Sequence, residues 1–219
     1  ISLIVNGSLH GDENILVSQL PVFDSRQAKA GSLFLALIGE NTDGKGFLQA
    51  FKKVDSPSGK KIAILGAGGA ARAIAVELAL DGAKDFMIIN RDEKRGQDLV
   101  SLLKTKLQVS AQFVAWSAKF KIPDSIDVLI NATSVGMADS GSYDLDIDLT
   151  SIKKTMIVAD VIVNPPQTNL LKSASSIGAK TIDGLGMVVN QAVIGVKYWT
   201  NFDVEPTIMH AELQRVLKL

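Results

Sequence analysis

Beyond Lys60, short apolar runs alternate with segments of helical periodicity. The apolar runs are "KKIAILGAG", "DFMIIN", "SAQFVAW", "IDVLINAT", "MIVADVIV" and "AKTIDG". The helical segments include "AARAIAVELALDGA", "RDEKRGQDLVSLLKTKL", "MVVNQAVIGVKYWT" and "EPTIMHAELQRVLKL". Apolar strands that alternate with helices indicate a parallel sheet covered on both faces. The pattern therefore predicts an α/β, doubly wound parallel sheet of the Rossmann type, with C-terminal helices packing back on it.

The chain before Lys60 follows a looser pattern. Its last part, "VDSPSGK", has the composition of a linker. Residues 1–50 read as short strands and turns that close with a helix after Gly44, and such a piece is too short for a robust core of its own. We therefore predict three parts, which are a small N-terminal α/β piece (1–55), a dinucleotide-binding Rossmann domain (56–186) and C-terminal helices (187–219).

Composition narrows the classes of function. The 219 residues include 23 basic and 23 acidic side chains, so the net charge is zero and nucleic acid is not an expected partner. No apolar run approaches the roughly 20 residues of a membrane span, and the first residues lack a secretion signal, so we expect a cytoplasmic protein. The absence of cysteine excludes disulfides and thiolate catalysis. His10 and His210 stand far apart, and no metal site is expected.

The stretch "ILGAGGAARA" follows the first apolar run and opens a helical segment. It has the G-x-G-x-x-A pattern of a dinucleotide-binding turn, with Gly66, Gly68 and Ala71 at the defined positions and Gly69 and Ala70 between them. The first glycine makes the tight turn and the second lets the backbone approach a pyrophosphate, which the helix N-terminus attracts. A glycine-rich turn without a ligand is the alternative.

The end of the second strand indicates which dinucleotide binds. An NAD site usually has an acid there for the ribose 2′-hydroxyl, whereas this chain has Asn90 and Arg91. A guanidinium pairs with the 2′-phosphate of NADP, and Lys94 and Arg95 add positive charge, although Asp92 opposes it. The sequence favours NADP over NAD. A solvated run of charges is the alternative.

Several motifs occur in the order and at the spacing of one enzyme family. They are "GENTDGKGF", "GAGGAARA", "NRD", "INATSVGM", "DVIVNPPQTNLL" and "DGLGMVVNQA". From about Gly39 onward the chain resembles shikimate dehydrogenase. The resemblance implies an NADP-dependent oxidoreductase that reversibly reduces 3-dehydroshikimate to shikimate, a small-molecule substrate.

The resemblance also implies site residues. Asn41 and Asp43 match the family loop that meets the substrate hydroxyls, with Asp43 as a catalytic partner, and Gln191 matches the substrate glutamine. Short acceptors and amides suit a polyhydroxylated acid. The alternatives are an Asx turn before a helix for Asn41 and Asp43, and a surface position on a helix for Gln191.

Further matches concern the cofactor. Asn131, Thr133 and Met137 correspond to positions around the nicotinamide ribose. Gly184 and Met187 correspond to the segment beside the nicotinamide ring. All five are therefore expected to be cofactor-binding residues.

Two departures from the family pattern put activity in doubt. The N-terminal lysine that pairs with the aspartate as acid–base residue is not found, and neither is the Ser-x-Ser that holds the substrate carboxylate. Val163 stands where the family pattern has Tyr. We therefore expect an impaired enzyme. The alternative is a non-catalytic chimeric or fusion protein that retains an NADP-binding Rossmann domain.

Residues 5–47 resemble a second family. "GSLHG", "DSR" and "GSLFLALIGEN" are similar to the N-terminal module of the Mur ligases, in particular UDP-N-acetylmuramoyl-tripeptide–D-alanyl-D-alanine ligase. That resemblance implies a role in binding a UDP-linked substrate, with Ser25 and Arg26 on the family motif. A structural turn at these residues is the alternative. The ATP-binding Gly-Lys-Thr loop is absent, so ligation is not expected.

Overall fold

The computed structural model describes residues 41–137 and 144–217. By its internal contacts the chain separates into residues 1–40 and residues 41–219. The expectations for residues 1–40, including most of the Mur-like motif, lie outside the described residues, and the domain boundaries at 55 and 186 remain predictions.

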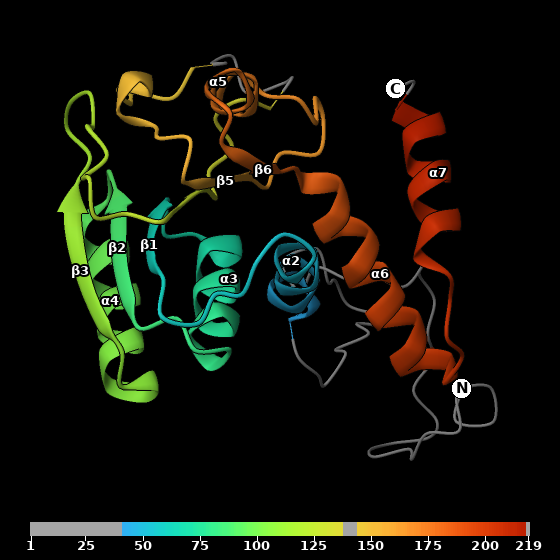
Figure 1. Cartoon of the computed structure of the whole chain (residues 1–219). Helices are drawn as coiled ribbons and strands as arrows, with labels where there is room; N and C mark the ends of the chain where they lie inside the picture. The colour runs from blue at the N-terminus through green and yellow to red at the C-terminus, as the bar shows by residue number, and fades with distance from the viewer. Residues whose placement is uncertain (1–40, 138–143, 218–219) are drawn as a thin grey trace, which may run out of the picture. The chain divides into compact units, whose positions relative to one another are not determined.

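Six parallel strands form one sheet in the order β3-β2-β1-β4-β5-β6 (Figure 1). The strands are β1 Lys61–Leu65, β2 Asp85–Asn90, β3 Ser110–Ala115, β4 Val128–Asn131, β5 Ile157–Asp160 and β6 Lys180–Ile182. Successive strands build outward from β1 in one direction and then, from β4, in the other. This confirms the doubly wound prediction, and it places the point where the strand order reverses between β1 and β4, where such sheets bind ligands.

Helices occupy most of the remaining described chain. They are α2 Thr42–Lys52, α3 Gly69–Leu80, α4 Glu93–Leu107, α5 Asn169–Ile177, α6 Gly184–Thr200 and α7 Pro206–Leu217, with a 3-10 turn η2 at Leu149–Ser151. The helix α2 begins two residues before Gly44, because the Asn41 side chain accepts the Asp43 amide N–H at 2.9 Å and caps it. None of the described helices is long and apolar enough to cross a membrane.

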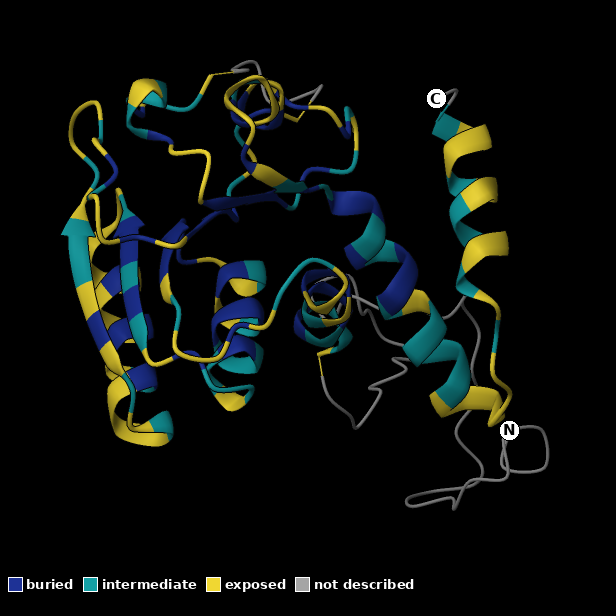
Figure 2. Ribbon diagram, viewed as in Figure 1, coloured by how far each residue is buried: buried dark blue, intermediate teal, exposed yellow. Residues whose placement is uncertain are grey.

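Two apolar clusters cover the two faces of the sheet. Buried residues are dark blue in Figure 2. In β1, Ile62 and Ile64 belong to the cluster shared with α2, α3 and α4. Ala63 and Leu65 belong to the cluster shared with α5. This alternation is the period-2 signature of a strand, and burial on both faces explains why the strands read as unbroken apolar runs.

Helix α2 lies close to both α3 and α6 because it presents glycine to each. A Cβ on Gly44 would lie 2.4 Å from the Ala73 carbonyl oxygen of α3. A Cβ on Gly46 would lie 2.5 Å from the Met187 carbonyl oxygen of α6. The Asn190 amide donates to the Gly46 carbonyl at 3.1 Å and joins the same crossing. These contacts attach the helix that carries Asp43 to the Rossmann sheet through α3 and α6.

Candidate functional site

The turn after β1 is built around Gly66. Its φ of +105° lies in the region that favours glycine, and a Cβ there would lie 2.9 Å from the Ala132 carbonyl oxygen. The Gly66 amide donates to the Ile89 carbonyl at 2.8 Å. The turn is thus fixed by β2 and by the end of β4, and it directs the chain into α3.

The space over the next two residues is open. A Cβ on Gly68 or Gly69 would meet no described heavy atom within 4 Å. Gly68 is the N-cap of α3, and no side chain caps that helix. The first-turn amides, which include those of Ala70 and Ala71, have no intrahelical acceptor and carry the positive end of the helix dipole. Uncapped amides under open space fit a dinucleotide pyrophosphate at this turn.

Arg91 follows the last residue of β2 and is exposed. It lines a cavity of about 450 Å³ at the carboxyl edge of the sheet, with Trp116, Ser117, Ser134, Val135, Asp144, Leu145 and Asp146. Within residues 41–137 and 144–217 its guanidinium makes no ion pair, whereas Arg95 lies 3.5 Å from the Asp92 carboxylate. Asn90 donates to the Asp92 carbonyl at 2.7 Å and shapes the turn. Among the described residues, nothing keeps the guanidinium of Arg91 from meeting a ligand phosphate.

Asn131 and Thr133 make a closed set of hydrogen bonds at the end of β4. The Asn131 Oδ1 accepts the Thr133 amide at 3.1 Å and the Thr133 hydroxyl at 2.7 Å. The Asn131 Nδ2 donates to the Val135 carbonyl at 3.1 Å, and the Val135 amide donates to the Thr133 hydroxyl at 3.1 Å. These side chains hold the turn after β4 in shape. Contact of either residue with a cofactor remains a prediction.

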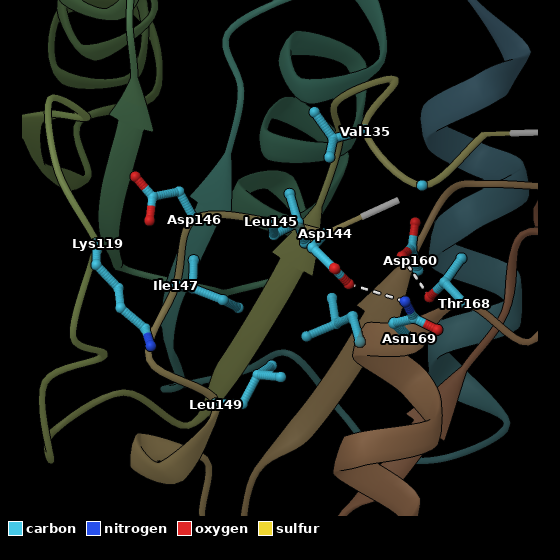
Figure 3. Close-up of a pocket in the computed structure, with 12 residues that line it drawn as sticks. Lys119, Val135, Asp144, Leu145, Asp146, Ile147, Leu149, Asp160, Thr168 and Asn169 are labelled. Atoms are coloured by element: carbon cyan, nitrogen blue, oxygen red, sulfur yellow. Dashed lines mark hydrogen bonds between the residues drawn. The ribbon is translucent and has the colours of Figure 1, made fainter. Parts of the chain in front are cut away.

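Asp160, at the end of β5, connects this turn to the loop before α5. Its Oδ1 accepts the Asn131 Nδ2 at 3.0 Å and the Ile162 amide at 3.1 Å, and its Oδ2 accepts the Thr168 hydroxyl at 2.8 Å. Figure 3 shows Asp160 and Thr168 facing each other. Both line a cavity of about 290 Å³. Desolvation by burial raises the pKa of Asp160 to about 6, although its hydrogen bonds lower it.

The sequence analysis did not single out Asp160 or Trp116. The signal for Asp160 was present, because an acid inside the apolar run "MIVADVIV" has to find hydrogen-bond partners once the strand is buried. Trp116 follows the strand β3, and nothing in the local pattern indicates that it lines a cavity.

The predicted substrate residues lie on two helices that cross. Asp43 is in the first turn of α2, and Gln191 is on α6, where its amide nitrogen and Cβ lie next to Gly46. The Oε1 of Gln191 is buried and has no hydrogen-bond partner among the described residues. Such an acceptor is costly unless a ligand or another group donates to it. The Oδ1 of Asn41 caps α2, so the Asx turn considered as an alternative for Asn41 is present.

The residues expected near the nicotinamide fall at two places. Met137 is exposed in the turn after β4, where its amide donates to the Ser134 carbonyl at 3.2 Å. Gly184 begins α6, and a Cβ there would lie 2.5 Å from the Ile162 carbonyl oxygen, so glycine lets this helix approach the end of β5. Met187 is buried in α6. None of the described residues forms a cluster that would hold a metal ion.

The strand order, the open turn before an uncapped helix and the arginine at the end of β2 define a dinucleotide-binding domain of the Rossmann class. Comparison with known proteins specifies the class. A family model described as shikimate/quinate 5-dehydrogenase matches residues 49–188. The chain belongs to this family.

Individual relatives agree with that assignment. The chain is 34% identical over 187 residues to the shikimate dehydrogenase (NADP(+)) of Desulforamulus reducens, covering 82% of this chain and 64% of that protein. A 5-ketofructose reductase from a Gluconobacter strain is 49% identical, with a TM-score of 0.78 over 81% of this chain and 64% of that one. A shikimate dehydrogenase solved with NADP+ is 33% identical, with a TM-score of 0.73 over 82% of this chain and 62% of that one. The chain thus spans less than two thirds of the length of these relatives.

Proposed function

We propose that the chain is an NADP-dependent oxidoreductase of the shikimate dehydrogenase type, which reversibly reduces 3-dehydroshikimate to shikimate. The observation that carries the proposal is the open space over Gly68 and Gly69 at the uncapped N-terminus of α3, together with the unpaired guanidinium of Arg91 among the described residues. When bound, the nicotinamide would supply or accept the hydride.

The residues of this chain would hold the cofactor along the carboxyl edge of the sheet. The amides at the start of α3 would donate to the pyrophosphate, and Arg91 would pair with the ribose 2′-phosphate. NADP is the preferred cofactor in this proposal, in keeping with the shikimate dehydrogenase (NADP(+)) of Desulforamulus reducens and with the shikimate dehydrogenase solved with NADP+. NAD lacks the phosphate that Arg91 would bind.

The substrate would lie near the N-terminal part of α2 and the middle of α6. The buried, unpartnered Oε1 of Gln191 would accept a hydrogen bond from a substrate hydroxyl, and Asp43 would take part in proton transfer. The lysine expected opposite Asp43 is not found. Lys45 lies two residues from Asp43, and its ammonium lies 3.5 Å from the Tyr198 hydroxyl on α6.

A second candidate function is reduction of a ketosugar. The 5-ketofructose reductase is 49% identical to this chain, against 34% for the Desulforamulus enzyme, and Val163 removes the phenol that the shikimate dehydrogenase pattern has. A chain with these features would reduce the ketone of a ketosugar through the same cofactor.

Absorbance at 340 nm decides between these functions. Purified chain with NADPH is given 3-dehydroshikimate or 5-ketofructose, and with NADP it is given shikimate. Oxidation of NADPH by one ketone alone assigns the substrate. NADP binding by calorimetry without turnover of either ketone would contradict both enzyme proposals and favour the non-catalytic alternative.

The Mur-like piece remains a proposal from sequence. The matches described above are to shikimate dehydrogenases and a related reductase, and they give no support to a Mur-ligase-like segment. If residues 5–47 bind a UDP-linked peptidoglycan precursor, calorimetry with UDP-N-acetylmuramoyl-tripeptide would show heat that an Arg26→Ala variant loses. No heat from the parent chain would contradict this binding role.

A further inference from the structure

Trp116 follows β3 and reaches the cavity that Arg91 lines. Its side chain packs against the apolar cluster shared with α5 and also forms part of the wall of this cavity. The wall includes Ser134 and Val135, which follow β4. The cavity therefore lies across the carboxyl ends of β2, β3 and β4. Its volume of about 450 Å³ is within the range of small-molecule sites.

The indole is held in place by hydrogen bonds. Its Nε1–H donates to the Asp146 carbonyl at 2.9 Å, and the same carbonyl accepts the Phe120 amide at 2.9 Å. The backbone amide of Trp116 donates to the Asn90 carbonyl at 3.0 Å. The ring is thus fixed before a ligand arrives, so binding against it costs little conformational entropy.

The position of Arg91 determines which part of a dinucleotide reaches this cavity. The 2′-phosphate and the adenine are carried by adjacent carbons of the same ribose. If Arg91 binds the phosphate, the base has to lie within one sugar ring of it. Asp144 and Asp146 belong to the same wall, and their negative charges disfavour a further phosphate there and favour the uncharged base.

We propose that Trp116 is an adenine-binding residue, whose indole provides an aromatic surface for the base of NADP while Arg91 binds the neighbouring phosphate. The inference rests on the proposed function. It adds an aromatic contact, from the end of β3, to the features that define the dinucleotide site. Base–aromatic stacking predicts that loss of the ring weakens binding roughly 5- to 150-fold.

The test compares two substitutions in the full chain. Calorimetry measures binding of 2′,5′-ADP, which has the adenine and the 2′-phosphate but no nicotinamide. Trp116→Leu should weaken binding by the factor given above, whereas Trp116→Phe keeps an aromatic face and should stay within about threefold of the parent. Trp199→Phe, on α6, is the matched control and should bind like the parent. An equal loss in the Phe and Leu variants would overturn the proposal, because it would mean that only the Nε1–H bond to Asp146 matters.

A second readout leaves Trp116 in place. In the Trp199→Phe background Trp116 is the single tryptophan, and saturating 2′,5′-ADP should change its emission, whereas nicotinamide mononucleotide should not. Unchanged emission at a concentration where calorimetry shows binding would overturn the proposal even if Trp116→Leu failed to fold. If the parent chain binds NADP and Trp116→Leu binds equally well, the inference alone fails. If the parent does not bind NADP, the proposed function fails and the inference fails with it.

Discussion

Single residues of the glycine-rich turn after β1 have separate roles. Gly66 cannot carry a side chain, because its φ is positive and the Ala132 carbonyl oxygen is close. Gly68 has an extended φ of −82° and open space, so a side chain there would fit sterically. In the proposed function, a side chain at this position would obstruct the pyrophosphate of the dinucleotide.

The first prediction uses this difference. Gly68→Asp places a carboxylate where the pyrophosphate would bind, and like-charge repulsion should weaken NADP binding at least about tenfold. The fold should be unaffected or slightly more stable, because Asp is a better N-cap than Gly. Calorimetry measures the affinity and thermal unfolding measures the stability. Gly68→Asn has the same shape without the charge, so an equal loss in that variant would argue for steric obstruction instead.

Arg91 carries the second prediction. Losing a charged hydrogen bond to the 2′-phosphate should cost about 1.5–3 kcal/mol, roughly 10- to 150-fold in NADP affinity, and should leave NAD nearly unaffected. Titration of Arg91→Ala with both cofactors measures this. Arg95→Ala is the comparison within the same charge cluster, because that guanidinium is already near Asp92. An equal loss for NADP and NAD in the Arg91 variant would contradict the assignment.

The third prediction concerns Asp160 and the pH dependence of the free energy of unfolding. The sign of this dependence follows from the direction of the pKa change. The folded pKa is raised to about 6 from 3.8, so the folded state holds a proton between those pH values that the unfolded state releases. The contribution of Asp160 to the free energy of unfolding is therefore largest below about pH 4, falls as the pH rises to about 6, and is constant above. The change amounts to roughly 3 kcal/mol.

Asp160→Asn tests this contribution. Its Oδ1 would still accept from Asn131 and Ile162, and its Nδ2 would donate to the Thr168 hydroxyl, so the variant should fold. Urea unfolding between pH 4 and 7 should show the parent losing stability relative to the variant as the pH rises. A difference between the two proteins that stays constant with pH would contradict the prediction.

At the scale of elements, α2 is the part that joins the predicted substrate residues to the sheet. Its two contacts with α3 and α6 depend on Gly44 and Gly46, where the helix backbones approach too closely for a side chain. The fourth prediction is that Gly46→Ala destabilises the fold by about 1–3 kcal/mol, because the new Cβ would press on the Met187 carbonyl.

Gly195→Ala on α6 is the matched control. A Cβ there meets no described atom within 4 Å, so the higher helix propensity of Ala should raise stability by up to about 1 kcal/mol. Urea denaturation of the two variants should therefore show opposite signs. A Gly46→Ala variant as stable as the parent would mean that α2 and α6 are not packed at this crossing.

At the scale of the whole molecule, the chain spans 64% of the length of the Desulforamulus relative, and the family lysine is not found. Positioned acid–base groups typically contribute 10²- to 10⁴-fold to rate. The fifth prediction is that the chain binds NADP but turns over shikimate slower than an ordinary enzyme by about that factor. Steady-state rates at 340 nm measure it, and turnover of about 1–10³ per second would contradict it and require another proton donor.

The sequence by itself determined the fold class of this protein and the glycine-rich turn after β1. Six apolar runs, each followed by turn residues, define the parallel strands, since burial on both faces leaves no polar alternation to confuse the pattern. Two further features are local, namely the glycine pattern at Gly66 and Gly68 and the position of Arg91 after β2. Each depends on the backbone or the side chain of the residue itself. These features could therefore be predicted from the sequence without knowledge of their tertiary contacts.

Only the tertiary structure decided how distant residues meet. Asn131, which the sequence suggested as a cofactor residue, has its side chain engaged by Thr133, Val135 and Asp160, and the last of these comes from a different strand. Trp116 and Arg91 share a cavity because β3 and β2 are neighbours and end at one edge of the sheet. Gln191 is left with a buried acceptor because α6 crosses α2 at Gly46. Hydrogen bonds and contacts between elements depend on strand order and helix crossing, which local periodicity does not encode.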